Sequence, residues 1–398
     1  MSLKNRKILL GITGGIAAYK MAYVASALHK MGAEVQVIMT KNATEFITPL
    51  TFETLINNKV YIDTFDRVFS WDVKHISLTT NADLFVVAPA TANFIAKAAV
   101  GMADDMLTST FLAATCPKVI YPAMNTHMYE NVATQRNMRQ LEEDGMIVVS
   151  PASGRLACGD VGKGRLPEPD DIVRMIHYLC AEEKDLAGKN IVVTAGPTRE
   201  FLDPVRYLSN LSSGKMGYAI ATCAAARGAN VTLISGPTNL QPPIGVHMLP
   251  VVSAAQMYEA VMDEMKNCDV LIKAAAVADY TPASYSDEKI KKKEGDNALV
   301  LNRTADILKQ AGSIKRPGQF ICGFSMETKD LIDNSKKKLE SKNADMIVAN
   351  NLKVEGAGFG VDTNVATIIT ADGCEELPLM SKEELANNIL DRIKAAMA

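Results

Sequence analysis

The feature that most constrains the fold is a strand–turn–helix–strand unit that occurs twice in the 398 residues. The first copy, KILLGITGGIAAYKMAYVASALHKMGAEVQVIMT, covers residues 7–40. The second begins with NIVVTAGPT at residue 190 and ends with GANVTLISGPT at residue 238. Each copy opens with a continuous apolar run, as expected for a strand buried on both faces of a parallel sheet. The repeat predicts an α/β protein with two Rossmann-like, doubly wound domains.

The length and composition agree with two globular domains. A chain of 398 residues exceeds one average core, and its 48% hydrophobic and 22% charged residues are ordinary for soluble proteins. The polar stretch HYLCAEEKDLAGKN separates the two units, so the predicted domains are 1–185 and 186–398. The first apolar run is broken by glycines, and no run approaches membrane-spanning length. We therefore expect no signal peptide and no membrane association.

Charge and cysteine usage exclude other classes. A net charge of −3 gives no overall electrostatic reason to bind nucleic acid or an anionic membrane. The seven cysteines are scattered, without a CxxC pair or a histidine at ligand spacing. This pattern argues against a zinc site and favours a reducing, cytoplasmic location.

Two loops in the first half are candidate cofactor contacts. Gly14 and Gly15 of TGGI precede a helix, where exposed amides and the helix dipole suit a phosphate. Thr91 and Asn93 of APATANF follow a buried strand and could bond the polar edge of a planar ring. Both loops could equally be structural turns between a strand and a helix.

Three residues of the first half could carry chemistry. Asn125 in YPAMN could bind a carboxylate or cap the next helix. His75 in WDVKHISL could be an acid–base group or a structural histidine. Cys158 lies in SGRLACGDVGKGRLPEP, where glycine and proline favour a surface loop. A cysteine is usually buried, so a thiol in this loop requires an explanation.

The second half offers another set of polar groups. VRYLSNLSSGKMG contains Arg206 and Asn210 and leads into a helix, so it is a candidate phosphate cradle. It lies on a stretch of about fifteen residues, 198–212, at the end of a first strand, where substrate contacts usually occur. Lys338 and Lys342 are four residues apart on a predicted helix and share one face. Lys289 begins a lysine-rich run whose remaining members we interpret as solvated.

The motifs ITGGIAAYK, HISL, APATAN and PAMN, followed by the Cys158 loop, resemble the histidine-containing flavoprotein decarboxylases in order and spacing. The resemblance extends over nearly the whole chain to the bacterial bifunctional phosphopantothenoylcysteine decarboxylase/phosphopantothenate–cysteine ligase family of coenzyme A biosynthesis. It implies a flavodoxin-like first domain. Two departures from the family pattern are Tyr129 in place of Trp, which we expect to affect subunit packing, and FSMET in place of FAAET at Phe324.

For the first half, the resemblance implies FMN and decarboxylation of 4'-phospho-N-pantothenoylcysteine to 4'-phosphopantetheine. His75 would be the base, Asn125 would hold the carboxylate, and Cys158 would deliver a proton when the enethiol is reduced. A donor on a closing loop can enter after the substrate and exclude water. The implied cofactor-binding residues are Gly14, Gly15, Ile16, Thr40, Thr91, Ala92, Asn93, Phe94 and Ala123.

For the second half, the resemblance implies activation of 4'-phosphopantothenate by CTP, through an acyl-cytidylate that cysteine then attacks. Mg2+ or Mn2+ would bridge the phosphates, with no protein ligands assigned. Arg206, Asn210 and Lys289 would be the catalytic residues, with Lys289, Lys338 and Lys342 neutralising triphosphate charge. The implied nucleotide-binding residues are Lys273, Ala274, Ala275, Asp279, Lys289, Ala305, Asp306, Ile307, Leu308, Phe324, Lys338 and Lys342.

Two other protein classes share parts of this sequence pattern. A two-domain NAD(P)-dependent oxidoreductase is disfavoured, because neither half has a G-x-G-x-x-G and the second strand ends at Thr40 without an acidic residue. A non-catalytic flavin-binding subunit would be expected to lack His75 or Cys158, and both are present. The resemblance implies a homo-oligomer of trimeric decarboxylase and dimeric ligase units, such as a dodecamer.

Overall fold

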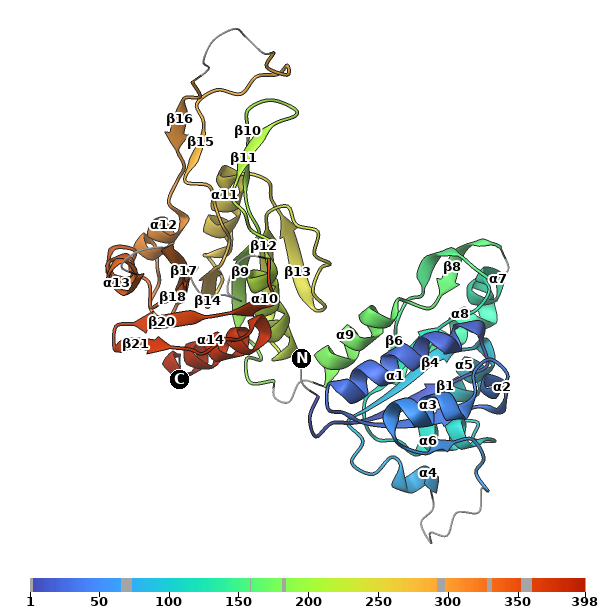
Figure 1. Cartoon of the computed structure of the whole chain (residues 1–398). Coiled ribbons are helices and arrows are strands. Elements are labelled where there is room, and N and C mark those ends of the chain that lie inside the picture. Colours follow the sequence, from blue (N-terminus) through green and yellow to red (C-terminus); the bar gives the residue numbers. More distant parts are fainter. Residues whose placement is uncertain are drawn as a thin grey trace. The chain divides into compact units, whose positions relative to one another are not determined.

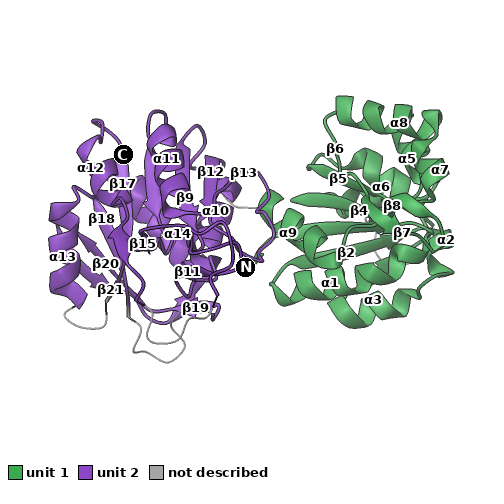
Figure 2. Cartoon of the chain, turned by 90° about the horizontal axis from the view of Figure 1, so that it is seen from above, with its two compact units in different colours: residues 1–180 green, residues 181–398 purple. Residues whose placement is uncertain are grey.

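The computed structural model of the chain describes residues 3–65, 74–157, 159–180, 184–291, 298–327, 331–351 and 360–397. The chain divides into two compact units, residues 1–180 and 181–398 (Figures 1 and 2). Among the described helices, none combines the length and the apolar content needed to cross a bilayer.

Unit 1 is built on a parallel sheet with the strand order β3-β2-β1-β4-β5-β6. Without β3, a two-residue edge strand, this is the flavodoxin-like order 2-1-3-4-5. The apolar runs of the sequence form the central strands, whose side chains are buried on both faces. The strands are β1 (Lys7–Ile12), β2 (Glu34–Met39), β3 (Val60–Tyr61), β4 (Leu84–Ala90), β5 (Lys118–Pro122) and β6 (Ile147–Val148).

Helices cover both faces of this sheet. On one face lie α1 (Lys20–Lys30), α3 (Pro49–Ile56) and α9 (Pro169–Leu179), and on the other lie α5 (Ala92–Ala99), α6 (Met106–Ala113) and α8 (Val132–Glu143). Shorter helices are η1 (Ile16–Tyr19), α2 (Lys41–Thr44), α4 (Lys74–Ser77) and α7 (Thr126–Glu130). An antiparallel hairpin of β7 (Ala152–Arg155) and β8 (Val161–Arg165) flanks residue 158.

Unit 2 repeats this plan with a larger sheet, ordered β13-β12-β9-β14-β17-β18-β20-β21. The strands are parallel as far as β18, and β20 and β21 extend the sheet antiparallel. They are β9 (Asn190–Ala195), β12 (Asn230–Ser235), β13 (Val246–Pro250), β14 (Val270–Lys273), β17 (Phe320–Glu327), β18 (Met346–Asn351), β20 (Ala366–Thr370) and β21 (Gly373–Glu376).

The helices of unit 2 also lie on both faces. α10 (Lys215–Ala226) and α14 (Lys382–Ala396) pack against each other on one face, and α11 (Ala254–Glu264), α12 (Ile307–Ser313) and α13 (Leu331–Ser341) contribute to the core on the other. A short antiparallel pair, β19 (Thr363–Asn364) with β22 (Met380–Ser381), precedes α14.

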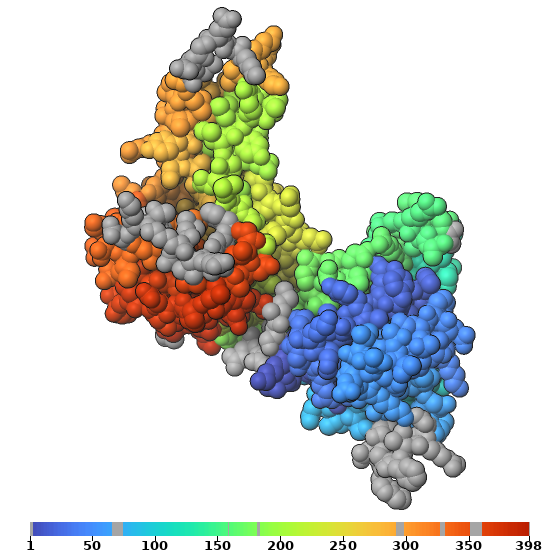
Figure 3. Space-filling view, in the orientation of Figure 1, coloured from blue at the N-terminus to red at the C-terminus, as the bar shows by residue number. Residues whose placement is uncertain are grey.

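The long loop expected at residues 198–212 contains a hairpin, β10 (Arg199–Phe201) with β11 (Tyr207–Ser209). A second hairpin, β15 (Tyr280–Pro282) with β16 (Leu301–Arg303), packs beside it. Together they form an arm that projects from unit 2 (Figures 1 and 3). The α/β architecture predicted for both halves is confirmed.

Candidate active sites

A pocket of about 510 Å3 opens in unit 1 at the carboxyl ends of β1, β4 and β5. The order of the strands reverses between β1 and β4, and ligands of open α/β sheets bind at such a switch point. Thr13 ties the two loops together, because its hydroxyl donates to Pro89 O at 2.7 Å and accepts from Thr91 N at 3.0 Å. The predicted residues that line the pocket are Gly14, Gly15, Ile16, Thr91, Ala92, Ala123 and Asn125.

Three predicted cofactor residues are not among the described lining residues. Thr40 caps α2, its hydroxyl accepting from Ala43 N at 3.2 Å. The Phe94 ring is buried against Phe111, with ring centroids 5.2 Å apart, so only its main chain could serve a cofactor. Asn93 is exposed on the first turn of α5.

Asn125 has the helix-capping role considered above and also faces the pocket. Its Oδ1 accepts from His127 N at 2.9 Å, which caps α7, and its Nδ2 donates to Asp160 Oδ2 at 2.9 Å. The β7–β8 hairpin approaches closely at Gly164, where a Cβ would lie 2.2 Å from Met124 O and φ is +141°. Glycine at this position therefore lets the hairpin lie against the Asn125 loop.

The other two catalytic candidates of unit 1 are placed less directly. His75 is half-buried on α4 and is not among the described residues that line the pocket. Cys158 lies outside the described residues, while its neighbours Leu156 and Ala157 line the pocket. Tyr129 packs against the core of unit 1.

A pocket of about 380 Å3 opens in unit 2 at the carboxyl ends of β9, β14 and β17, the corresponding switch point. Gly214 caps α10 with a φ of 77°, and a Cβ there would lie 2.8 Å from Thr238 Cγ2. This glycine allows the first turn of α10 to reach the pocket. The predicted residues that line the pocket are Asn210, Lys273, Ala274, Ala275, Asp279, Phe324 and Lys338.

Lys273 is the most perturbed cation of this pocket. Burial, and next the positive charge of Lys338, lowers the pKa of Lys273 to about 8. Lys338 donates to Phe324 O at 3.2 Å. An anion that entered here would meet two ammonium groups in a site partly shielded from water, where their attraction is stronger than in bulk solvent.

The loop predicted from residues 305–308 lies beside this pocket and does not line it. Asp306 caps α12 by accepting from Lys309 N at 2.9 Å and forms an ion pair with Lys342. Ile307 and Leu308 are buried in the core, and Ala305 is exposed. These residues and Lys342 are not among the described lining residues.

Arg206 and Lys289 also lie away from the described lining of the pocket. Arg206 Nε donates to Asp203 Oδ2 at 2.9 Å, and its Nη2 donates to Ile290 O at 2.8 Å. Ile290 N donates to the same Asp203 oxygen at 3.1 Å. Lys289 is exposed next to this anchored residue.

Asn210 holds the opposite loop of the pocket. Its Nδ2 donates to Ala276 O at 3.2 Å and to Val277 O at 3.1 Å, so its amide fixes the backbone that follows β14.

The polar residues that line the pocket and were not assigned from the sequence include Lys215, Asn350, Asn364 and Lys382. Lys215 stands within the motif SSGKMG, whose position before a helix predicts a phosphate cradle but no separate role for this lysine. The capping box Ser381–Glu384 could have located the start of α14 and hence Lys382. Nothing in the sequence indicates that these distant segments meet.

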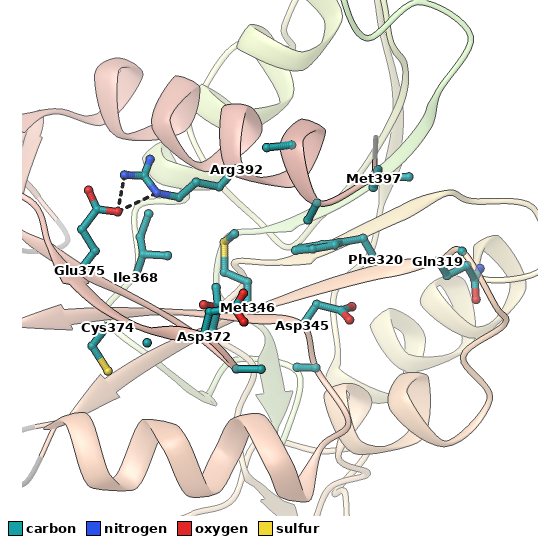
Figure 4. Close-up of a pocket in the computed structure, with 17 residues that line it drawn as sticks. Gln319, Phe320, Asp345, Met346, Ile368, Asp372, Cys374, Glu375, Arg392 and Met397 are labelled. Carbon is teal, nitrogen blue, oxygen red and sulfur yellow. Dashed lines mark hydrogen bonds and ion pairs between the residues drawn. The ribbon is translucent and has the colours of Figure 1, made fainter.

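Figure 4 shows a further pocket of about 950 Å3 at the amino ends of β17 and β18. Arg392 on α14 donates to Glu375 Oε2 on β21 at 2.7 and 3.1 Å at its rim. None of the predicted site residues is among the described residues that line it. Within the described ranges, no group of three or more His, Cys, Asp or Glu side chains is placed to hold a metal ion.

Two family models and several known proteins are similar to this chain. The family model "Flavoprotein" matches residues 1–180, and "DNA/pantothenate metabolism flavoprotein C-terminal domain" matches residues 186–397. The Coenzyme A biosynthesis bifunctional protein CoaBC of Bacillus subtilis is 51% identical over 99% of this chain and 98% of its own length. The protein of the same name from Vibrio vulnificus is 45% identical over 100% and 99%. A crystal structure of the C-terminal domain of a CoaBC protein is 45% identical, with a TM-score of 0.47, and covers 54% of this chain and 98% of that one. The chain belongs to the family of the bifunctional coenzyme A biosynthesis proteins CoaBC.

Proposed function

We propose that unit 2 joins 4'-phosphopantothenate to cysteine and that unit 1 decarboxylates the product to 4'-phosphopantetheine. Membership of the family makes the chain a bifunctional enzyme of coenzyme A biosynthesis with decarboxylase and ligase activity. The observation that carries the division of labour is that each unit has its own pocket at its own switch point. The flavoprotein model matches unit 1, and four lysines line the pocket of unit 2.

The pocket of unit 1 fits FMN. Gly14 and Gly15 precede η1; Gly15 N donates to Thr13 O at 2.9 Å, so the Gly14 amide and the amides of the first turn of η1 would bind the phosphate, and a Cβ on Gly15 would have no neighbour closer than 3.9 Å. Ala92 and Ala123 offer small apolar surfaces to a planar ring. When bound, FMN supplies the two-electron redox chemistry that makes the substrate carboxylate easy to lose and that returns the two electrons when the resulting enethiol is reduced.

Three side chains would handle the substrate in unit 1. The Asn125 amide would bind the carboxylate, which replaces Asp160 as the acceptor of the Nδ2 group. His75 would be the base that accepts the proton of the substrate thiol. Cys158 would donate a proton to the carbon of the enethiol left after carbon dioxide departs, because its neighbours Leu156 and Ala157 line the pocket.

In unit 2, the carboxylate of 4'-phosphopantothenate would attack the α-phosphorus of CTP and release pyrophosphate. The cysteine amine would then attack the acyl carbon and release CMP. Lys273 and Lys338, which line the pocket, would stabilise the phosphate charge together with Lys289 from outside the described lining, with Mg2+ or Mn2+ bound to the phosphates. Asn210 would orient the acyl group through the backbone of Ala276 and Val277, whose carbonyl oxygens accept both N–H donors of its Nδ2 group. We also propose a cytoplasmic homo-oligomer of trimeric and dimeric units.

The decarboxylase proposal is tested with the full-length protein. Heat release should yield FMN, and recovery of FAD, of NAD or of no flavin would contradict it. Cys158→Ser should still release carbon dioxide but fail to form 4'-phosphopantetheine, because proton donation follows decarboxylation. A normal rate of 4'-phosphopantetheine formation by this variant would exclude Cys158 as the donor.

The ligase proposal is tested by supplying 4'-phosphopantothenate, magnesium and CTP, first without cysteine and then with it. Lys289→Gln should slow pyrophosphate release roughly 100- to 1000-fold, the usual effect of losing one transition-state contact. Asn210→Asp should form the acyl-cytidylate but convert it poorly to amide. Parental rates of pyrophosphate release by Lys289→Gln, or of amide formation by Asn210→Asp, would refute the assigned roles. Faster turnover of the parent protein with ATP than with CTP would refute the choice of nucleotide and leave the ligase proposal standing.

A further inference from the structure

Part of the wall of the unit 2 pocket is formed by the beginnings of two helices. Lys215 is the first residue of α10, and Lys382 is the first residue of α14. Both line the pocket, together with Asn350 and Asn364. We call this group the α10–α14 wall.

The wall carries excess positive charge. The charged residues among the described lining are four lysines, Lys215, Lys273, Lys338 and Lys382, and one acid, Asp279. Asp362 pairs with Lys215 at 2.7 Å, but its own side chain is 88% exposed. The amino ends of α10 and α14 add partial positive charge to the same wall.

Two effects disfavour a positive charge on Lys382 at this position. It is only 6% exposed, and a lysine at the first position of a helix meets the positive end of the helix dipole. Lys382 Nζ donates to Val361 O, and its main-chain N donates to Asp362 O at 2.9 Å. Burial, and next the charge of Lys215, lowers the pKa of Lys382. An anion in the pocket would offset both the burial of this ammonium group and its unfavourable position at the helix dipole.

The neighbouring polar groups are ordered. Asn364 is 3% exposed, and its Nδ2 donates to Asn350 Oδ1 at 3.0 Å. Lys215 also donates to Gly360 O at 3.1 Å, so both lysines are attached to the segment before β19. Side chains fixed in this way lose little rotamer freedom when a ligand binds.

We propose that Lys382 and Lys215 form a phosphate-binding subsite of the ligase pocket. The inference rests on the proposed ligase function and deepens it. The phosphate would belong either to the triphosphate tail of the nucleotide or to 4'-phosphopantothenate, and these sources are distinguished by which Michaelis constant depends on Lys382.

The test compares Lys382→Met and Lys382→Arg in the full-length protein by following pyrophosphate release. Lys189→Met is the matched control, because exposed Lys189 immediately precedes β9, at the edge opposite the pocket. Lys382→Met should raise one KM roughly tenfold or more, as expected for loss of a charged hydrogen bond, while Lys382→Arg retains most of the affinity. If the tail is bound, the KM for CTP rises and inhibition by pyrophosphate weakens; if the substrate phosphate is bound, the KM for 4'-phosphopantothenate rises instead.

The proposed subsite would be refuted if, in Lys382→Met, both KM values and the inhibition by pyrophosphate stayed within about twofold of the parent. If Lys382→Met is inactive, calorimetric titration with CTP, pyrophosphate and 4'-phosphopantothenate measures affinity without turnover, and unchanged binding of all three overturns it equally. A parent protein that releases no pyrophosphate from CTP refutes the ligase proposal instead. The same titrations with parent and variant then decide the subsite separately.

Discussion

Lys273 shows how a single half-buried cation can make substrate binding depend on pH. Its lowered pKa of about 8 results first from burial and then from the charge of Lys338. In the free protein, Lys273 is therefore an ammonium below about pH 8 and an amine above it. Only the ammonium attracts a triphosphate, and a bound triphosphate would in turn raise this pKa.

We therefore expect the affinity of the ligase for CTP to fall as the pH rises through about 8, by at most about tenfold per pH unit. Lys273→Met should bind CTP more weakly at pH 7 and lack this component of the pH dependence. The measurement is the KM for CTP between about pH 7 and pH 9, with Lys189→Met as the control. Parallel pH profiles for the parent and Lys273→Met would contradict the assignment.

At the scale of elements, one carboxylate ties the β10–β11 hairpin to the Lys289 segment, which lies between β15 and β16. The Asp203 side chain is fully buried and accepts hydrogen bonds from Val205 N, Arg206 N and Ile290 N at 2.9, 2.9 and 3.1 Å. Its contact with the Arg206 guanidinium lowers the pKa of Asp203. The β10–β11 turn thereby fixes the backbone beside Lys289.

Asp203→Asn should loosen this connection, because an amide has one acceptor oxygen and no charge for Arg206. We expect pyrophosphate release to slow by roughly tenfold, the effect of losing a charged hydrogen bond, and trypsin to cleave after Lys289 or Lys291 more readily. Asp287→Asn, in the exposed part of the same segment, is the matched control. Parental rates of both cleavage and pyrophosphate release in Asp203→Asn would rule out this positioning role.

The elements differ in how far the sequence predicts them. Strands such as β4 and β17 appear as apolar runs because both of their faces are buried, and the glycine loops meet because parallel strands end at one edge. The β10–β11 hairpin was expected as a loop, since short, partly exposed strands leave little apolar pattern. Lys382 was missed because its role depends on a tertiary contact between α10 and α14.

At the scale of the whole molecule, the two units share one topological plan. In each, the first strand lies at the centre of the sheet and the pocket opens beside its carboxyl end. Asp185, which the predicted boundary assigns to the first domain, accepts from Arg227 Nε at 2.8 Å and from Lys394 Nζ at 2.8 Å, both in unit 2. Leu186 is buried, and its main-chain N donates to Arg227 O at 3.0 Å.

These contacts determine where the chain should be cut to separate the two activities. We expect a fragment of residues 1–180 to retain decarboxylase activity and a fragment of residues 184–398 to retain ligase activity, because each keeps its own sheet and pocket.

A ligase fragment that starts at residue 187 loses Asp185 and leaves Arg227, whose side chain is 13% exposed, without that partner. Asp391 still pairs with Arg227 at 2.7 Å, so the loss should be smaller than the roughly 3–5 kcal/mol of a buried charge left with no partner, and this fragment should unfold at a lower denaturant concentration. Denaturant titration and activity of the three fragments provide the measurement. Loss of both activities in folded fragments would mean that the sites are shared between the units. Equal stability of the 184–398 and 187–398 fragments would mean that Asp185 does not stabilise unit 2.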